Sequence, residues 1–123
     1  GTGMEYKAAR DAGVVQLAKN DGVIEKVESG DVANTYVVTL EIKGKRFSSE
    51  TFADKIKEIS NSGVKELVFI IGGANGLDEK VSQRSNLKLS FSDMTFTHQM
   101  IRVLLIEQIY RAFKINNNEV YHK

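Results

Sequence analysis

Residues 67–71 form an unbroken apolar segment, Leu-Val-Phe-Ile-Ile, which constrains the fold more than any other part of the chain. The segment is too short for a helix. Turn-forming residues at 61–63 precede it, and Gly72 and Gly73 follow it. Such a run is typical of a strand that is buried on both faces of a parallel sheet.

Two preceding segments complete a βαβ unit. Residues 36–42 are β-branched and aromatic, which is typical of a strand. Ser48 and Ser49 offer a helix N-cap, and an apolar stripe with helical spacing follows at Phe52, Ile56 and Ile59. Because strand, helix and buried strand follow one another, the chain is predicted to have an α/β fold with an open, mainly parallel sheet flanked by helices.

The segments on either side extend this pattern. Residues 5–27 have a helical composition that Gly13 and Gly22 interrupt, which predicts a broken or kinked helix. Asp78 is expected to cap a short helix that ends at Arg84. Alternation of apolar and polar residues over 87–91 predicts a further strand.

The most strongly helical segment begins after His98 and runs to about Phe113. Its apolar positions cover more than a narrow stripe: Met100, Ile101, Leu104, Leu105, Ile109, Ala112 and Phe113. Two interpretations remain open. The helix packs on its own sheet and also on a partner subunit, or it is a central core helix.

Composition limits the function classes. With 123 residues, the chain is expected to be a single domain over 1–123, with residues 1–3 a tag or a cut end. The absence of cysteine excludes disulfide scaffolds, Cys-based zinc sites and cysteine nucleophiles, and two histidines make a metal site unexpected. No apolar run approaches the roughly 20 residues needed to cross a bilayer, so a cytoplasmic protein is expected.

Only the C-terminal third of the chain has a clear excess of basic side chains. The net charge is +1, but residues 84–123 hold six basic and three acidic side chains. A basic surface of this kind could face phosphate, although such an excess is common by chance.

Three segments could carry chemistry. The glycines at 72, 73 and 76 follow a buried strand, where ligands bind in open α/β sheets, although they could also serve only as a tight turn. Residues 90–98 bring hydroxyl, carboxylate and imidazole groups to one rim, with Met94 and Phe96 as an apolar wall for a flat ring. The tail at 121–123 is either a frayed terminus or, if it folds back, a tyrosine and cations suited to a nucleic-acid base and its phosphates.

Three longer stretches resemble one family. Residues 69–77 (FIIGGANGL), residues 89–102 (LSFSDMTFTHQMIR) and residues 107–123 (EQIYRAFK to YHK) closely resemble the RlmH family, the SPOUT-class methyltransferases of large-subunit ribosomal RNA. The resemblance runs from about Asp21 to the last residue. It implies a SPOUT-type α/β fold with a C-terminal trefoil knot and a homodimer with its cofactor site near the interface. It also implies S-adenosyl-L-methionine-dependent methylation of N3 of a pseudouridine in 23S rRNA on the ribosome.

The same resemblance assigns roles to individual residues. It implies cofactor contacts at Leu40, Gly73, Ser92, Asp93, Met94, Thr95, Phe96 and Thr97. It implies catalytic roles for His98, Tyr121 and His122 and RNA contacts for Arg111 and Lys123. His98 would act as a base or as an orienting group, because a helix N-terminus disfavours a positive charge on the imidazole.

The chain departs from the family pattern in two ways. Family members have a further N-terminal strand-helix portion, and they have proline where this chain has Thr97. Proline would fix φ, so Thr97 is expected to leave the loop less pre-organised. An alternative function follows from these departures, namely a non-catalytic knotted dimer module that binds cofactor or RNA.

Overall fold

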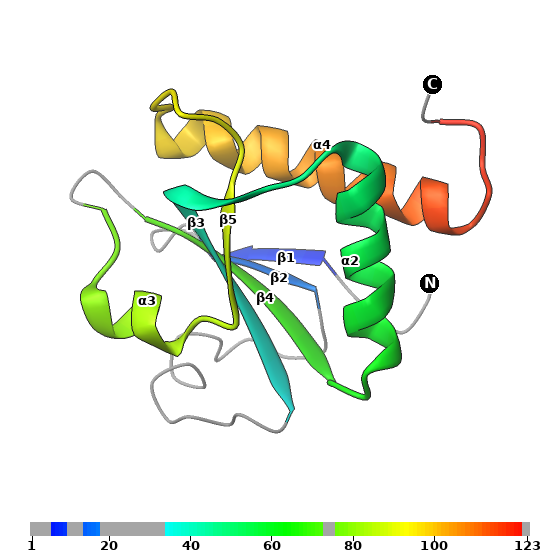
Figure 1. Ribbon diagram of the computed structural model, residues 1–123, viewed down its shortest axis with the longest axis horizontal. Helices are drawn as coiled ribbons and strands as arrows, with labels where there is room; N and C mark the ends of the chain where they lie inside the picture. The colour runs from blue at the N-terminus through cyan, green and yellow to red at the C-terminus, as the bar shows by residue number, and fades with distance from the viewer. Residues whose placement is uncertain (1–5, 10–13, 18–33, 73–75, 122–123) are drawn as a thin grey trace.

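A computed structural model describes residues 6–9, 14–17, 34–72 and 76–121 of the protein. Along the chain the elements are β1(Tyr6–Ala9), β2(Val14–Leu17), β3(Thr35–Arg46), α2(Ser49–Asn61), β4(Glu66–Ile71), α3(Glu79–Arg84), β5(Leu87–Ser90) and α4(His98–Asn116) (Figure 1). The strands form one sheet in the order β1-β2-β4-β3-β5. The α/β class predicted from the sequence is therefore confirmed.

The parallel part of the sheet runs from its middle strand, β4, through β3 to the edge strand β5. The prediction of a mainly parallel sheet is therefore only partly right, because two of the four strand pairings are antiparallel. β3 pairs in parallel with β4 on one side and with β5 on the other. All six residues of β4 are buried, as the apolar run predicts for a central strand. Ser48 caps α2 in a capping box with Thr51, and Asp78 caps α3, so both predicted N-caps are confirmed.

The predicted helix over 5–27 is wrong where the structure describes it. Residues Tyr6–Ala9 and Val14–Leu17 are strands, with β1 antiparallel to β2 and β2 antiparallel to β4. Without β2, the edge of β4 opposite β3 would leave its backbone donors and acceptors unpaired, and ladder pairing outweighs a weak helical propensity. Val14 and Val15, which are β-branched, also favour a strand. Gly13, Gly22 and the rest of 18–27 lie outside the described residues.

Each face of the sheet has its own core. On one face, α2 and α4 pack on Val38, Leu67 and Phe69, which are at most 1% exposed. On the other face, Val37 and Val68 pack against Leu77, which precedes α3, and against Val81 of α3. This alternation is the two-residue period of a strand.

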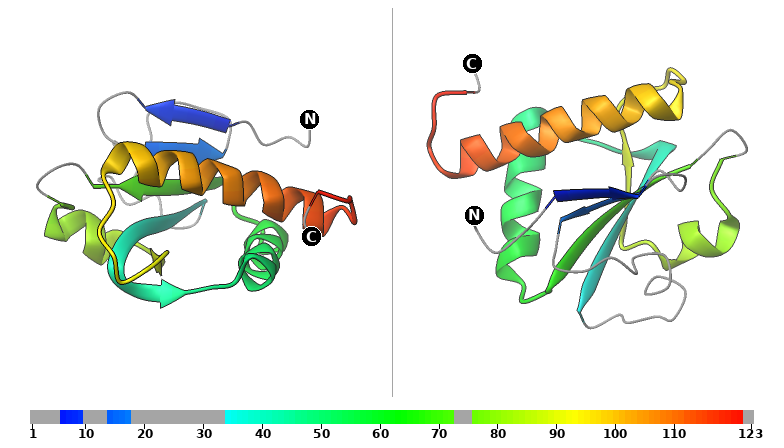
Figure 2. Two further views of the ribbon diagram at one scale, coloured as in Figure 1. Left: turned by 90° about the horizontal axis from the view of Figure 1, so that it is seen from above. Right: turned by 180° about the vertical axis from the view of Figure 1, so that it is seen from behind.

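Helix α4 is only partly covered. Leu105, Ile109 and Ala112 are buried, whereas Met100 is 54% exposed and Val103 is 64% exposed. It crosses the fold from the end of β5 to beyond α2 (Figure 2). The helix is therefore not a central core helix, and one apolar side of it lies open. None of the described helices is long and apolar enough to cross a membrane.

Candidate functional site

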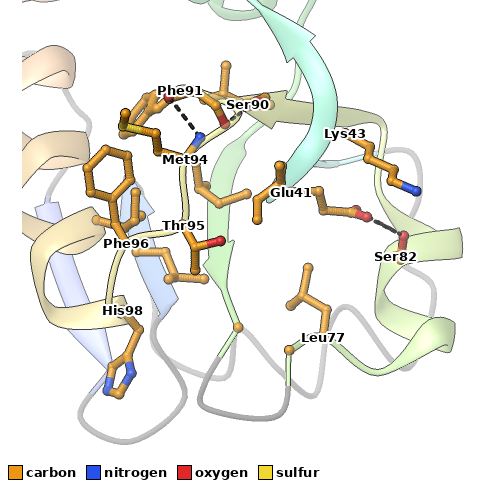
Figure 3. Close-up of a pocket in the computed structure, with 18 of the residues that line it drawn as sticks. Glu41, Lys43, Leu77, Ser82, Ser90, Phe91, Met94, Thr95, Phe96 and His98 are labelled. Atoms are coloured by element: carbon orange, nitrogen blue, oxygen red, sulfur yellow. Dashed lines mark hydrogen bonds between the residues drawn. The ribbon is translucent and has the colours of Figure 1, made fainter.

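A cavity of about 610 Å³ opens at the carboxyl ends of the parallel strands (Figure 3). Leu40 is the last β3 residue paired with β4, Ile71 ends β4, and Ser90 ends β5; all three line the cavity. Gly72, Gly76 and Leu77 line it from beyond β4. The carboxyl ends of parallel strands are where open α/β sheets bind ligands.

A bulge in β3 brings additional residues to this cavity. Leu89 of β5 pairs with Leu40 and again with Lys45, so the intervening residues 41–44 leave the ladder. Gly44 makes this close return of the chain feasible, because a Cβ there would lie 2.6 Å from the carbonyl oxygen of Lys88. Residues 41–43 consequently line the cavity.

The loop between β5 and α4 forms another wall and is held by short-range contacts. The Ser90 hydroxyl donates to the Ser92 carbonyl oxygen at 3.2 Å, and the Met94 backbone N–H donates to Ser92 Oγ at 3.0 Å. Arg46, at the end of β3, forms an ion pair with Asp93. Thr97 is the N-cap of α4 and accepts from the Met100 backbone N–H at 3.3 Å. Threonine thus forms a capping contact that proline could not form, while its effect on loop order stays a prediction.

Most of the residues singled out in the sequence for the cofactor meet at this cavity. Leu40, Ser92, Met94, Thr95 and Phe96 line it, together with His98 at the start of α4. Asp93 and Thr97 do not line it, because their side chains make the ion pair and the helix cap just described. Gly73 lies outside the described residues.

Sequence reasoning missed four polar residues of the cavity: Glu41, Lys43, Glu79 and Ser82. Glu41 follows Leu40 directly, so its proximity could have been suspected. The exposure of Glu41 to the cavity depends on the bulge. Ser82 comes from α3, the short helix that packs on the opposite face of the sheet from α2 and α4. The sequence holds no local signal for either arrangement.

A second group of polar residues lies near the other end of α4. The Tyr121 hydroxyl donates to Glu107 Oε2 at 2.8 Å, and Arg111 Nη2 donates to the same oxygen at 2.7 Å. The Arg111 guanidinium also lies over the Tyr121 ring, 4.9 Å from its centre, and Tyr110 meets that ring edge-on. The tail therefore folds back onto α4 as far as Tyr121. His122 and Lys123 lie outside the described residues.

The two groups are far apart within one chain. His98 and Arg111 are thirteen residues apart on one continuous helix. At a rise of 1.5 Å per residue, this separates them by about 20 Å. The structure thus brings His98 to the predicted cofactor residues but does not bring Arg111 or Tyr121 there.

The hydrogen bond to Glu107 raises the pKa of Tyr121 above its ordinary value of 10.0. Because the carboxylate accepts from the neutral phenol, the contact is present below the ordinary pKa and is lost as the pH rises through the raised value. Replacing Glu107 by glutamine is expected to move the pKa of Tyr121 back toward its ordinary value, which site-specific NMR of the tyrosine ring carbons can follow. Glu119→Gln is the matched control, because Glu119 pairs with Lys114 rather than Tyr121. An unchanged pKa in Glu107→Gln would contradict this assignment.

Metal-ligating side chains do not cluster in the part of the chain that the structure describes. There, no three His, Cys, Asp or Glu side chains come together in a group that could hold an ion.

Comparison with known proteins adds two findings. The sequence profile of the family described as "Predicted SPOUT methyltransferase" matches residues 6–122. A protein named "Putative ribosomal RNA large subunit methyltransferase H", from Methanococcus vannielii, is 60% identical over 88 residues. The match covers 72% of this chain and 55% of that protein, so the chain spans about half the length of the curated relative it matches.

Proposed function

Because the chain belongs to the SPOUT methyltransferase family, and within it to the ribosomal RNA large subunit methyltransferase H group, we propose that it is an RNA methyltransferase. The proposed reaction transfers a methyl group from S-adenosyl-L-methionine to N3 of a pseudouridine in 23S rRNA. The observation that carries this proposal is the cavity at the strand ends, because the segment 92–98 that resembles the family lines it at five of its seven positions. The proposal also implies a cytoplasmic protein that acts on the ribosome.

The cavity suits the proposed cofactor in size and chemistry. Its 610 Å³ falls within the roughly 300–1,000 Å³ typical of small-molecule sites. Met94, Phe96 and Leu77 offer apolar surface for the adenine ring, while Ser92 and Thr95 offer hydroxyl groups. When bound, the cofactor would supply an electrophilic methyl group.

The residues near Tyr121 suit the RNA. A tyrosine ring stacked against a guanidinium is a surface on which an unpaired base can stack, and Arg111 adds a positive charge for phosphate or for the base as it loses its N3 proton. Glu107 fixes both side chains and so pre-organises this surface. We assign Arg111, Tyr121, His122 and Lys123 to the substrate, and His98 to orienting or deprotonating it.

A homodimer would bring together the cavity residues of one chain and the residues near Tyr121 of the other. Within one chain they are about 20 Å apart, too far for direct cooperation. The exposed apolar side of α4, which includes Met100 and Val103, would be covered by a second copy. Such a dimer would set the His98 end of one α4 beside the Tyr121 end of the other. A trefoil knot in the C-terminal part is also part of this proposal.

Methyl incorporation tests the proposed function. Ribosomes lacking the modification, incubated with the protein and labelled S-adenosyl-L-methionine, are expected to gain a methyl group at N3 of one pseudouridine, mapped by mass spectrometry. His98→Ala and Tyr121→Ala should each reduce incorporation strongly, and undiminished activity in both would contradict their roles. Calorimetry with S-adenosyl-L-methionine distinguishes the enzyme from the alternative of a non-catalytic module. Cofactor binding without methylation favours the module. No binding at millimolar cofactor excludes the enzyme.

A further inference from the structure

Glu41 is a carboxylate that the fold holds in place at the wall of the cavity. The Thr39 hydroxyl donates to Glu41 Oε2 at 2.7 Å, and the Ser82 hydroxyl lies 2.9 Å from Oε2 and 3.1 Å from Oε1. Thr39 is itself fully buried in β3. Because two elements, β3 and α3, fix the same carboxylate, its position is set before any ligand arrives.

The charge of Glu41 is not neutralised by these contacts. Two hydroxyl donors occupy about half of the four lone-pair positions that a carboxylate offers. Among the described residues, no Lys, Arg or His forms an ion pair with Glu41, and its recorded hydrogen bonds come from hydroxyl groups alone. A fixed, partly buried carboxylate with open acceptor positions attracts a cation.

The order of residues around the cavity indicates which part of a ligand meets this carboxylate. Figure 3 shows Met94 and Phe96 on one side, and Lys43 and Ser82 on the other. The Glu41 side chain begins between them and extends to the Ser82 hydroxyl. An adenine ring suits the apolar side, and the Lys43 ammonium suits the α-carboxylate of an amino acid. In S-adenosyl-L-methionine, the positively charged sulfur lies between these two ends of the molecule.

Resting on the proposed function, we propose that Glu41 is a specificity-determining residue that recognises the sulfonium charge of the cofactor. The methylated cofactor carries this charge, and the product S-adenosyl-L-homocysteine, a neutral thioether, does not. The two ligands are otherwise alike in their adenine, ribose and amino-acid groups. Glu41 therefore makes the cavity prefer the substrate form, and the product loses that attraction once the methyl group has left.

Calorimetry with both ligands tests this role. For Glu41→Gln, which keeps the size of the side chain and removes its charge, the affinity for S-adenosyl-L-methionine is expected to fall about tenfold relative to that for S-adenosyl-L-homocysteine. Glu41→Ala should change the ratio of the two affinities by a similar factor. Glu58→Gln is the matched control: it removes one negative charge from an exposed position on α2, where Glu58 pairs with Lys55, and should leave the ratio unchanged.

The outcomes separate this inference from the function on which it rests. If the unsubstituted protein binds neither ligand at millimolar concentration, the proposed function fails. If it binds both, and Glu41→Gln weakens both equally, then Glu41 contacts a group common to them, such as the ribose, and the sulfonium assignment is overturned. A preserved unfolding midpoint in each variant would show that a changed ratio does not come from misfolding.

Discussion

A purified heterodimer of one His98→Ala chain and one Tyr121→Ala chain is expected to recover about half of the methyl transfer activity of the unsubstituted dimer. Each variant alone is expected to lose about a hundredfold or more, because each homodimer lacks a reacting or positioning group at both of its sites. In the heterodimer, the intact His98 of one chain would meet the intact Tyr121 of the other. One of the two sites would then be complete.

The reason for this expectation is geometric. His98 lines the cavity at the start of α4. Tyr121 is hydrogen-bonded to Glu107 and its ring lies against Arg111, which is about 20 Å along the helix from His98. If the two groups serve one reaction, they must come from different chains. Two affinity tags, one on each chain, allow the heterodimer to be isolated from both homodimers.

The contrary result would be equally clear. If His98 and Tyr121 of the same chain act together, every chain of the heterodimer carries one defect and no activity returns. Recovery in a heterodimer of His98→Ala and Leu40→Ala chains would also contradict the arrangement, because both of those residues lie in the same cavity and a single chain must supply both.

Regular hydrophobic patterns predicted most of the fold. The apolar run at 67–71 predicted a central strand, and the Phe52, Ile56 and Ile59 stripe predicted the buried side of α2. These patterns are informative because the period of a buried face is a local property of the chain. The resemblance to the family singled out the loop over 92–97, and four of its six residues line the cavity: Ser92, Met94, Thr95 and Phe96.

What the sequence could not reveal depends on pairing between distant segments. Val14 and Val15 form a strand because β4 offers them an unpaired edge, and that edge belongs to a segment some fifty residues later. Glu41 reaches the cavity because Leu89 pairs twice with β3. A register shift of this kind is a property of two strands together, so a single-strand pattern does not encode it.

Gly44 is where this register shift is most sensitive to substitution. A Cβ at this position would lie 2.6 Å from the Lys88 carbonyl oxygen and 2.9 Å from the Leu89 backbone nitrogen. Both atoms are backbone, so no side chain can turn away, and β3 and β5 must separate by about 1 Å to reach ordinary contact. Gly44→Ala is expected to lower the free energy of unfolding by about 1–3 kcal/mol, measured by chemical denaturation.

The larger effect of Gly44→Ala is expected in activity. The displaced strands carry Leu40 and Glu41 on one wall of the cavity and Ser90 on another, so the shift misplaces several contacts at once. A misplacement of about 1 Å can cost roughly a hundredfold in rate, and we expect a loss of that size in methyl transfer.

Gly63→Ala separates damage to the cavity from loss of stability. Gly63 has φ of +93° in the turn after α2, and nothing lies within 4 Å of a Cβ built there. Alanine at this position strains the backbone by about 1 kcal/mol, yet it lies outside the set of residues that line the cavity. Gly63→Ala should therefore lose stability while keeping cofactor affinity, whereas Gly44→Ala should lose both. Equal cofactor affinity in the two variants would show that the β3 bulge does not shape the binding site.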